Sequence, residues 1–369
     1  MANKQFTLSK NQYSALGKLV SRYGGDIDDI IEEIVTEKAG DDFLKKSSAE
    51  MEKTGKVVVV DKTVLSNIEE FIKLGLDAKE WYDGMNKKII GALGDSDGTL
   101  FLMLMAIFSA NATLQTNFRN ASRMFEGIKS DVTDSKKRKV LEEMLNEPKL
   151  YDILKSFQTM SLKNLMNTMK LKRRYLSLGV VKALQGVRGI NSYLPNVMRI
   201  LKMYKSSGYK FSKRDVVDEL SKTFDPNKGT LGKNTIVSAE KIFSFTLNLL
   251  DPGFKFEGGW MPVTIDTWMA TFFFPYMDKK EKTKFLSRKS NYAYLAKITT
   301  ELASKFGMQP HELQAICWVA TLRKKKGENY SVDFNQAIKK NLQKMKVSAD
   351  EIKNISSAFD KVIATVGAV

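Results

Sequence analysis

The feature that most constrains this chain is the helical spacing of its apolar residues. From about residue 65 onward, apolar side chains recur every three or four positions, in one segment after another. In one such segment, Leu114, Phe118, Ala121 and Phe125 fall on a single helix face. The clearest β-like run, residues 56–61, is too short and too isolated to define a sheet. The spacing therefore predicts an all-α fold.

The 369 residues are enough for two domains, or for one large helical domain with extensions. We divide the sequence into an N-terminal accessory helical segment (1–64), a main helical domain (65–330) and a C-terminal helical extension (331–369). The first residues mix polar and apolar side chains and do not have the pattern of a signal peptide. The longest apolar run, residues 100–108, is about half the length of a membrane span. We therefore expect a buried helix there, and no membrane contact.

The scarcity of cysteine and histidine excludes several kinds of site. With Cys317 as its one cysteine, the chain has no internal disulfide framework and no four-cysteine iron–sulfur cluster. With His311 as its one histidine, it is a poor match to a Ser-His-Asp hydrolase or a histidine-rich zinc site. We expect neither a metal nor a cofactor, and this composition fits a reducing intracellular compartment.

The charge of the chain indicates a polyanionic partner. There are 59 Lys and Arg residues against 42 Asp and Glu residues, which gives a net charge of +17. Lysines and arginines that neutralise phosphates gain affinity by releasing counterions, so nucleic acid is the partner that this charge favours. The basic residues gather in four runs, at residues 136–139, 170–174, 279–280 and 323–326. Any one of these runs, taken alone, also fits a solvated helix end, but the four runs together with the net charge favour a polyanionic partner.

Two separated stretches contain residues suited to chemistry. The first, residues 108–114, is a polar break between an apolar helix and an amphipathic one, and it also fits a simple helix–turn–helix corner. The second runs from Lys241 through an apolar helix and an insertion to Asp266, where a new helix should begin. Asp266 is either the N-cap of that helix or a partly desolvated carboxylate that takes a proton or stabilises positive charge on a sugar.

Read together, these stretches resemble the helix-hairpin-helix DNA glycosylase superfamily, which includes endonuclease III and the 8-oxoguanine glycosylases. The resemblance spans about residues 66–330. Residues 109–113 (SANAT) resemble the segment whose Asn or Gln enters the gap left by a flipped base, and Asn111 stands at that position. Residues 264–268 (TIDTW) resemble the element with the catalytic aspartate, at Asp266, and Lys241 matches the lysine nucleophile of bifunctional members. A similar Lys…Phe…Asn-Leu…Val-Thr-Ile-Asp pattern occurs in glycosylase-like proteins of bacteriophages.

The sequence departs from the family at the hairpin. The glycines of the usual Leu-Pro-Gly-Val-Gly motif let backbone amides approach a DNA phosphate, whereas residues 237–240 (VSAE) contain no glycine. Gly229 and Gly232 lie in a nearby loop with Lys233, so either the hairpin has moved there or its phosphate contact is lost. The histidine that commonly follows the aspartate is replaced by Trp268. The four-cysteine cluster of endonuclease III is absent, as it is in the 8-oxoguanine glycosylases.

The resemblance implies a two-lobed helical bundle and a DNA glycosylase, with or without AP-lyase activity, that flips a damaged or modified base out of duplex DNA. Lys241 would attack the sugar as a neutral amine, or it is a plain surface lysine and Asp266 activates water instead. The candidate DNA contacts are Ser109, Asn111, Arg173, Arg174, Gly229, Gly232 and Lys233. The candidate base-pocket residues are Trp260, Trp268, Gln314 and Trp318, whereas the run Phe272-Phe273-Phe274 fits either a pocket or the core.

The alternative is a non-catalytic DNA-binding protein of a virion or nucleoid, built on a glycosylase-derived fold. The basic charge favours both interpretations equally. The missing hairpin glycines favour the alternative, and the presence of both Lys241 and Asp266 favours the enzyme. In either case we expect a monomer that binds double-stranded DNA in the cytoplasm, or in the host cytoplasm or virion if a bacteriophage encodes the chain.

Overall fold

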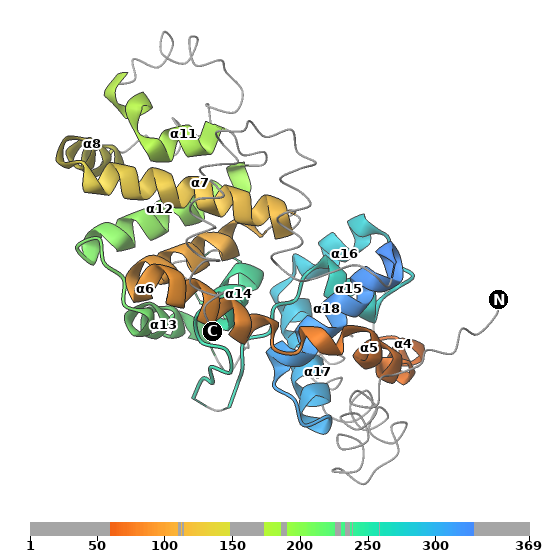
Figure 1. Cartoon of the computed structure of the whole chain (residues 1–369). Coiled ribbons are helices and arrows are strands. Elements are labelled where there is room, and N and C mark those ends of the chain that lie inside the picture. Colours follow the sequence, from red (N-terminus) through yellow and green to blue (C-terminus); the bar gives the residue numbers. More distant parts are fainter. Residues whose placement is uncertain are drawn as a thin grey trace. The chain divides into compact units, whose positions relative to one another are not determined.

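The computed structural model describes residues 60–109, 112, 114–147, 173–185, 190–225, 230–232, 237, 239–257 and 259–327 (Figure 1). Across these residues the chain is helical, and the strands described are β1 (Phe224–Asp225) and β2 (Thr230–Leu231), of two residues each. They pair antiparallel, with Phe224 opposite Leu231. The prediction of an all-α fold is confirmed. Residues 1–59 and 328–369, which include the predicted C-terminal extension, lie outside the described part.

The chain divides into two compact units that interleave along the sequence. The first unit holds the chain up to Gly84, residues Phe224–Leu231, and the chain from Asp251 onward to the end of the described part. The second unit holds Met85–Thr223 and Gly232–Leu250. The stretch 65–330, treated above as one helical domain, thus contributes to both units.

The first unit is built around its last described helix, α18 (Pro310–Lys326), which packs against α5, α15 and α17. A Cβ added at Gly75 would lie 2.2 Å from the carbonyl oxygen of Ile316, so glycine is what allows α5 to approach α18 this closely. The side chains of Phe272, Phe273 and Phe274 are all buried in this core, which decides between the two interpretations of that run. The other helices of the unit are α4 (Lys62–Ser66), α5 (Ile68–Gly75), η2 (Leu76–Ala78), α15 (Thr267–Phe273), α16 (Lys279–Leu286) and α17 (Lys289–Lys305).

Helix α6 (Trp81–Phe108) enters the second unit and carries its most apolar segment. It is interrupted at Gly94, whose φ of 76° is a conformation that glycine adopts without strain. By length and composition the segment Ile68–Phe108 also passes the test for a membrane span, a test that buried core helices pass as well. The side chains of residues 100–108 are all buried within the protein, as the sequence predicts.

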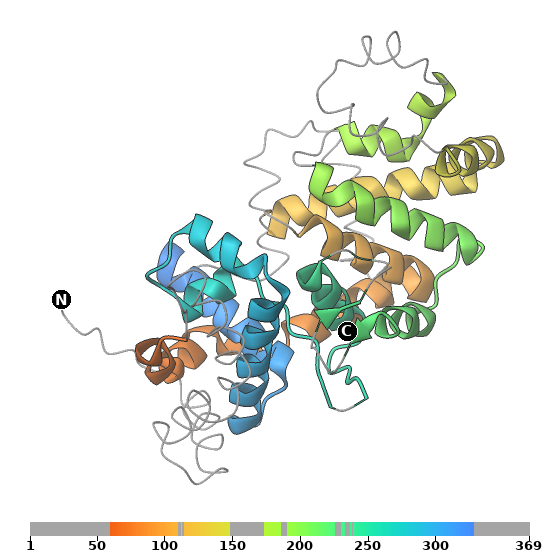
Figure 2. The same ribbon diagram turned by 180° about the vertical axis from the view of Figure 1, so that it is seen from behind.

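Among the remaining helices of the second unit, α7 packs against both α8 and α11. Helix α7 lies beside both α8 and α11 in the two opposite views (Figures 1 and 2). The backbones of Gly127 in α7 and Gly179 in α11 are in direct contact. A Cβ atom added to Gly179 would lie only 2.7 Å from Cα of Gly127, so a larger residue would push the two helices apart. The helices are α7 (Leu114–Thr133), α8 (Ser135–Leu145), η3 (Arg173–Ser177), α11 (Gly179–Gln185), α12 (Ile190–Ser206), α13 (Lys213–Ser221) and α14 (Glu240–Leu250).

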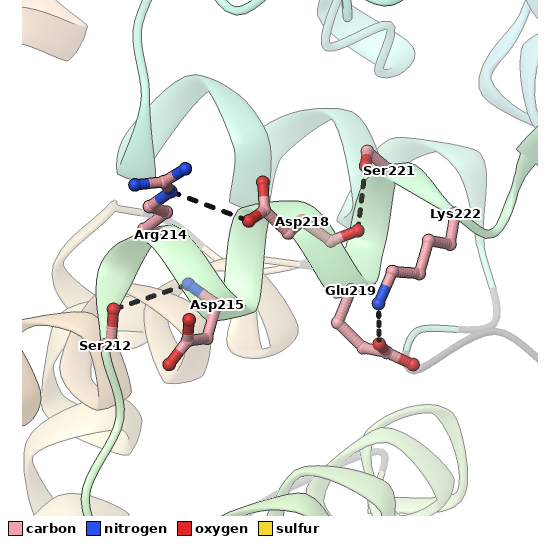
Figure 3. Close-up of polar contacts among 7 residues, drawn as sticks. All are labelled: Ser212, Arg214, Asp215, Asp218, Glu219, Ser221 and Lys222. Carbon is pink, nitrogen blue, oxygen red and sulfur yellow. Dashed lines mark hydrogen bonds and ion pairs between the residues drawn. The ribbon is translucent and has the colours of Figure 1, made fainter.

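Helix α13 shows how the polar faces of these helices are arranged (Figure 3). The hydroxyl of Ser212 caps its start by accepting a hydrogen bond from the Asp215 amide at 3.4 Å. Along the outer face, Arg214 faces Asp218 at 3.8 Å, and on the next turn a lysine and a glutamate form a second ion pair. Exposed pairs of this kind stabilise a helix only slightly, so α13 is held chiefly by its buried side chains, which are Val216, Val217 and Leu220.

Candidate functional site

Lys241 and Ser109, which are far apart in the sequence, are in contact in the second unit. Lys241 is the second residue of α14, and its ammonium donates a hydrogen bond to the Ser109 carbonyl oxygen at 3.0 Å. Ser109 follows the last residue of α6, and its hydroxyl donates to the Ala106 carbonyl oxygen at 2.7 Å. The last carbonyls of a helix lack partners within it and form the negative end of its dipole, so a lysine is a favourable partner there.

Helix α14 holds Lys241 in place because the rest of the helix is core. Every residue from Ile242 to Leu250 is buried, whereas Lys241 keeps partial exposure. At the other end of α14, the amide of Asn86 donates to the carbonyl oxygens of Leu249 and Leu250, at 2.8 and 2.9 Å. The end of α6 therefore meets the start of α14, and the early part of α6 meets the end of α14. Contacts at both ends of α14 therefore fix the position of the lysine.

Asp266 is the N-cap of α15 in the first unit, at the position where the sequence predicts a helix start. Its Oδ1 accepts hydrogen bonds from the backbone amides of Trp268 and Met269, at 2.9 and 3.0 Å. The chain before it is fixed by Tyr292, whose hydroxyl accepts from the Ile265 amide at 3.0 Å and donates to the Val263 carbonyl at 2.8 Å. Sequence reasoning missed this tyrosine, because nothing near it in the chain links it to residue 266.

Basic side chains cover the ring of Trp268, two residues after Asp266. The ammonium groups of Lys325 and Lys326 lie 5.3 and 5.6 Å from the centre of the indole ring. At these distances a cation is attracted by the face of the ring. The end of α18 thus brings part of the basic run 323–326 over a side chain of the first turn of α15, the helix that Asp266 caps. The sequence predicts both features, but not that they share one surface.

The other three predicted pocket residues have contacts elsewhere in the first unit. Trp260 lies 5.2 Å from the ring of Phe224 and packs against the core. Gln314 is buried and accepts a hydrogen bond from the Tyr82 hydroxyl at 2.6 Å, and Trp318 meets Trp81 edge to face at 5.4 Å. Gln314 and Trp318 are one helical turn apart on α18 and both contact the start of α6.

The predicted DNA contacts are only partly described. Gly232 is exposed, and its amide donates to the Thr223 carbonyl oxygen at 2.8 Å. Arg174 is exposed as well and is ion-paired with Glu143. Arg173 begins η3, but its side chain lies outside the described part, as do Asn111, Gly229 and Lys233.

His311 and Cys317 are both buried in the first unit. Burial lowers the pKa of His311 below 6.5, against the opposing effect of Glu312 and Asp83, whose carboxylate lies 3.7 Å from Nε2. Burial raises the pKa of the Cys317 thiol, which makes it a poor nucleophile. Within the described residues no group of three or more His, Cys, Asp or Glu side chains is arranged to hold a metal ion.

Residues 203–326 are similar to a protein family described as a family of unknown function, DUF7178. The match covers about a third of the chain, from the end of α12 to the end of α18, and includes both Lys241 and Asp266. Comparison with curated proteins gave no match. Comparison with solved structures gave none either.

Proposed function

We propose that this chain is a DNA glycosylase of the helix-hairpin-helix type, the superfamily that its sequence resembles. The observation that carries the proposal is the contact between the Lys241 ammonium and the Ser109 carbonyl, at 3.0 Å. In the resemblance these two positions belong to the nucleophile and to the segment that fills the gap of a flipped base. Their contact across 132 residues is what a shared site in the second unit requires.

The chemistry assigns a separate role to each residue. A base must rotate out of the stack before its glycosidic bond is accessible, at a cost of a few kcal/mol. Lys241, after losing a proton, attacks the sugar carbon, and the base leaves with the bonding electron pair and gains a proton. The C1′–O4′ bond of the resulting N-glycosylamine then breaks, O4′ gains a proton, and the protonated Schiff base that forms permits β-elimination of the strand. The resemblance assigns to Asp266 the role of assisting the proton transfers and stabilising positive charge on the sugar. In the monofunctional variant of this proposal, Asp266 activates a water molecule, and Lys241 takes no part in the reaction and only binds the DNA.

Borohydride trapping on a panel of modified-base duplexes tests the proposal. Borohydride reduces a Schiff base to a stable amine, so a bifunctional enzyme becomes covalently linked to its substrate. We expect an adduct that is lost in Lys241→Gln and reduced in Asp266→Asn. Lys289→Gln is the matched control, because Lys289 also donates to a backbone carbonyl, that of Leu231 at 2.8 Å. That variant should still form the adduct.

The results also discriminate the second candidate function, a non-catalytic DNA-binding protein. Two observations favour it: residues 237–240 lack the hairpin glycines, and Oδ1 of Asp266 is engaged by two backbone amides. Base release without an adduct would identify the monofunctional reaction. Duplex binding with neither adduct nor base release on any substrate would refute the enzyme and leave the second candidate.

A further inference from the structure

The basic run at the end of α18 is divided in two by its tertiary contacts. Arg323 forms a bidentate ion pair with Asp77, at 2.6 and 2.7 Å. Lys324 pairs with Glu70 at 2.8 Å and lies 4.2 Å from the centre of the Phe71 ring. Both side chains therefore fasten α18 to α5 and η2, and their charges are balanced within the protein.

Lys325 and Lys326 lie instead over the ring of Trp268 in α15. Lys282 of α16 is close enough to Lys325 for the charge of one to act on the other. Lys282 is only 7% exposed, which is unusual for a lysine. No hydrogen bond or ion pair to its ammonium occurs among the described residues, and its pKa is lowered, first by burial and then by Lys325.

The carboxylates nearest to Lys282 do not balance this charge fully. Asp278 and Glu281 both act on Lys282 to favour its charged form. Each also accepts a backbone amide in the capping box of α16, at 2.7 and 2.8 Å, so part of its hydrogen-bonding capacity is used there. The positive charges of Lys282 and Lys325 repel each other where they are partly shielded from water, which is unfavourable for the free protein. An anion bound between them would remove this repulsion and be held by both charges.

We propose that Lys282, Lys325 and Lys326, which together with Trp268 we name the lysine face, bind backbone phosphates of duplex DNA. The inference rests on the proposed function in taking duplex DNA as the partner, but it does not depend on catalysis. Trp268 orients two of the three cations, and Asp266 caps the same helix two residues earlier. A phosphate on the lysine face would therefore be bound at the first turn of the helix that Asp266 caps.

The salt dependence of duplex binding by the full-length chain tests the proposal. Each phosphate neutralised by a lysine steepens the slope of log affinity against log salt by about 0.9, which is about a 3.5-fold loss of affinity between 50 and 200 mM salt. We expect Lys325→Gln and Lys326→Gln each to flatten the slope by about one contact. We expect Lys282→Met to flatten the slope by the same amount. The same substitution should raise the melting temperature of the free protein, because it removes a desolvated charge.

Two matched variants serve as controls. Lys284→Gln removes the same charge from an exposed position on α16, and it should leave the slope nearly unchanged. Lys324→Gln breaks the pair with Glu70, and it should lower the melting temperature with little effect on the slope. An equal change of slope in Lys284→Gln, or a wild-type slope in the lysine-face variants, would overturn the inference. If the wild-type protein does not bind duplex DNA at all, the proposed function fails together with it.

Discussion

The buried carboxylate of Asp131 holds the start of α11. It accepts the amides of Gly179 and Val180 at 2.8 and 2.9 Å, one on each oxygen, and the side chain is fully buried. The first amides of a helix have no partner within it, and Leu178, which precedes α11, has no side-chain acceptor. Asp131 of α7 therefore caps α11 from a neighbouring helix. The backbone contact of Gly127 with Gly179 permits that approach.

We predict that Asp131→Ala lowers the free energy of unfolding by about 3 kcal/mol. The substitution leaves the two amides at the start of α11 without an acceptor, at about 1–3 kcal/mol each, and relief of the desolvated carboxylate offsets part of that sum. Asp131→Asn retains one acceptor oxygen and should lose about half as much. The loss should be measured by urea denaturation, together with hydrogen exchange of peptides from α11.

The contribution of Asp131 should also depend on pH. Burial raises the pKa of this carboxyl above 3.8, against the opposing effects of the two amides and of Lys137 and Lys182. A raised native pKa means that the stabilisation is complete below the unfolded pKa and decreases as the pH rises through the native pKa. The difference in stability between wild type and Asp131→Asn should therefore shrink as the pH increases across this range.

Asp134→Ala is the matched control for this cap. Asp134 also accepts two backbone amides, those of Lys136 and Lys137, but it caps its own helix α8 from an exposed position. Its removal should increase exchange in α8 and leave α11 unaffected. Unchanged exchange in α11 after Asp131→Ala, or equal exchange in the control, would refute the reasoning.

Three further predictions concern single positions. His311 is the one histidine, so its proton NMR titration is unambiguous, and we expect a midpoint below 6.5. The free energy of unfolding should decrease as the pH falls through that midpoint, because the buried neutral ring must then take up a proton. A midpoint above 6.5 would contradict this prediction. Gly75→Ala should destabilise the protein by about 1–3 kcal/mol in thermal melts, because its Cβ would lie 2.2 Å from the Ile316 carbonyl oxygen; an unchanged melting temperature would show that the helices separate freely. Lys241→Met should lower the free energy of unfolding, measured by urea denaturation, by about 1.5–3 kcal/mol, because the Ser109 carbonyl loses this donor. An unchanged free energy of unfolding would contradict the contact.

Some features of the site were visible in the sequence because they depend on neighbours in the chain. An aspartate before a new apolar helix predicts a cap, and Asp266 is one. The signal for Asp131 was present as well, since it continues the apolar stripe of Met124 and Ile128 on α7, where a carboxylate needs a special reason. Lys282 and Tyr292 gave no such signal, because what distinguishes them is contact with other helices.

The sequence by itself determined the helical class, the burial of residues 100–108 and the start of α15. These follow from periodicity and capping, which act over one or two turns of the chain. Only the tertiary structure decided that Lys241 meets Ser109. It also decided that Arg323 and Lys324 contact carboxylates of η2 and α5, and that Lys325 and Lys326 lie over Trp268. A lysine or arginine looks the same in sequence whether it contacts a carboxylate or an aromatic ring in the fold. The difference arises from which helices pack together, and adjacent residues of one helix project in different directions.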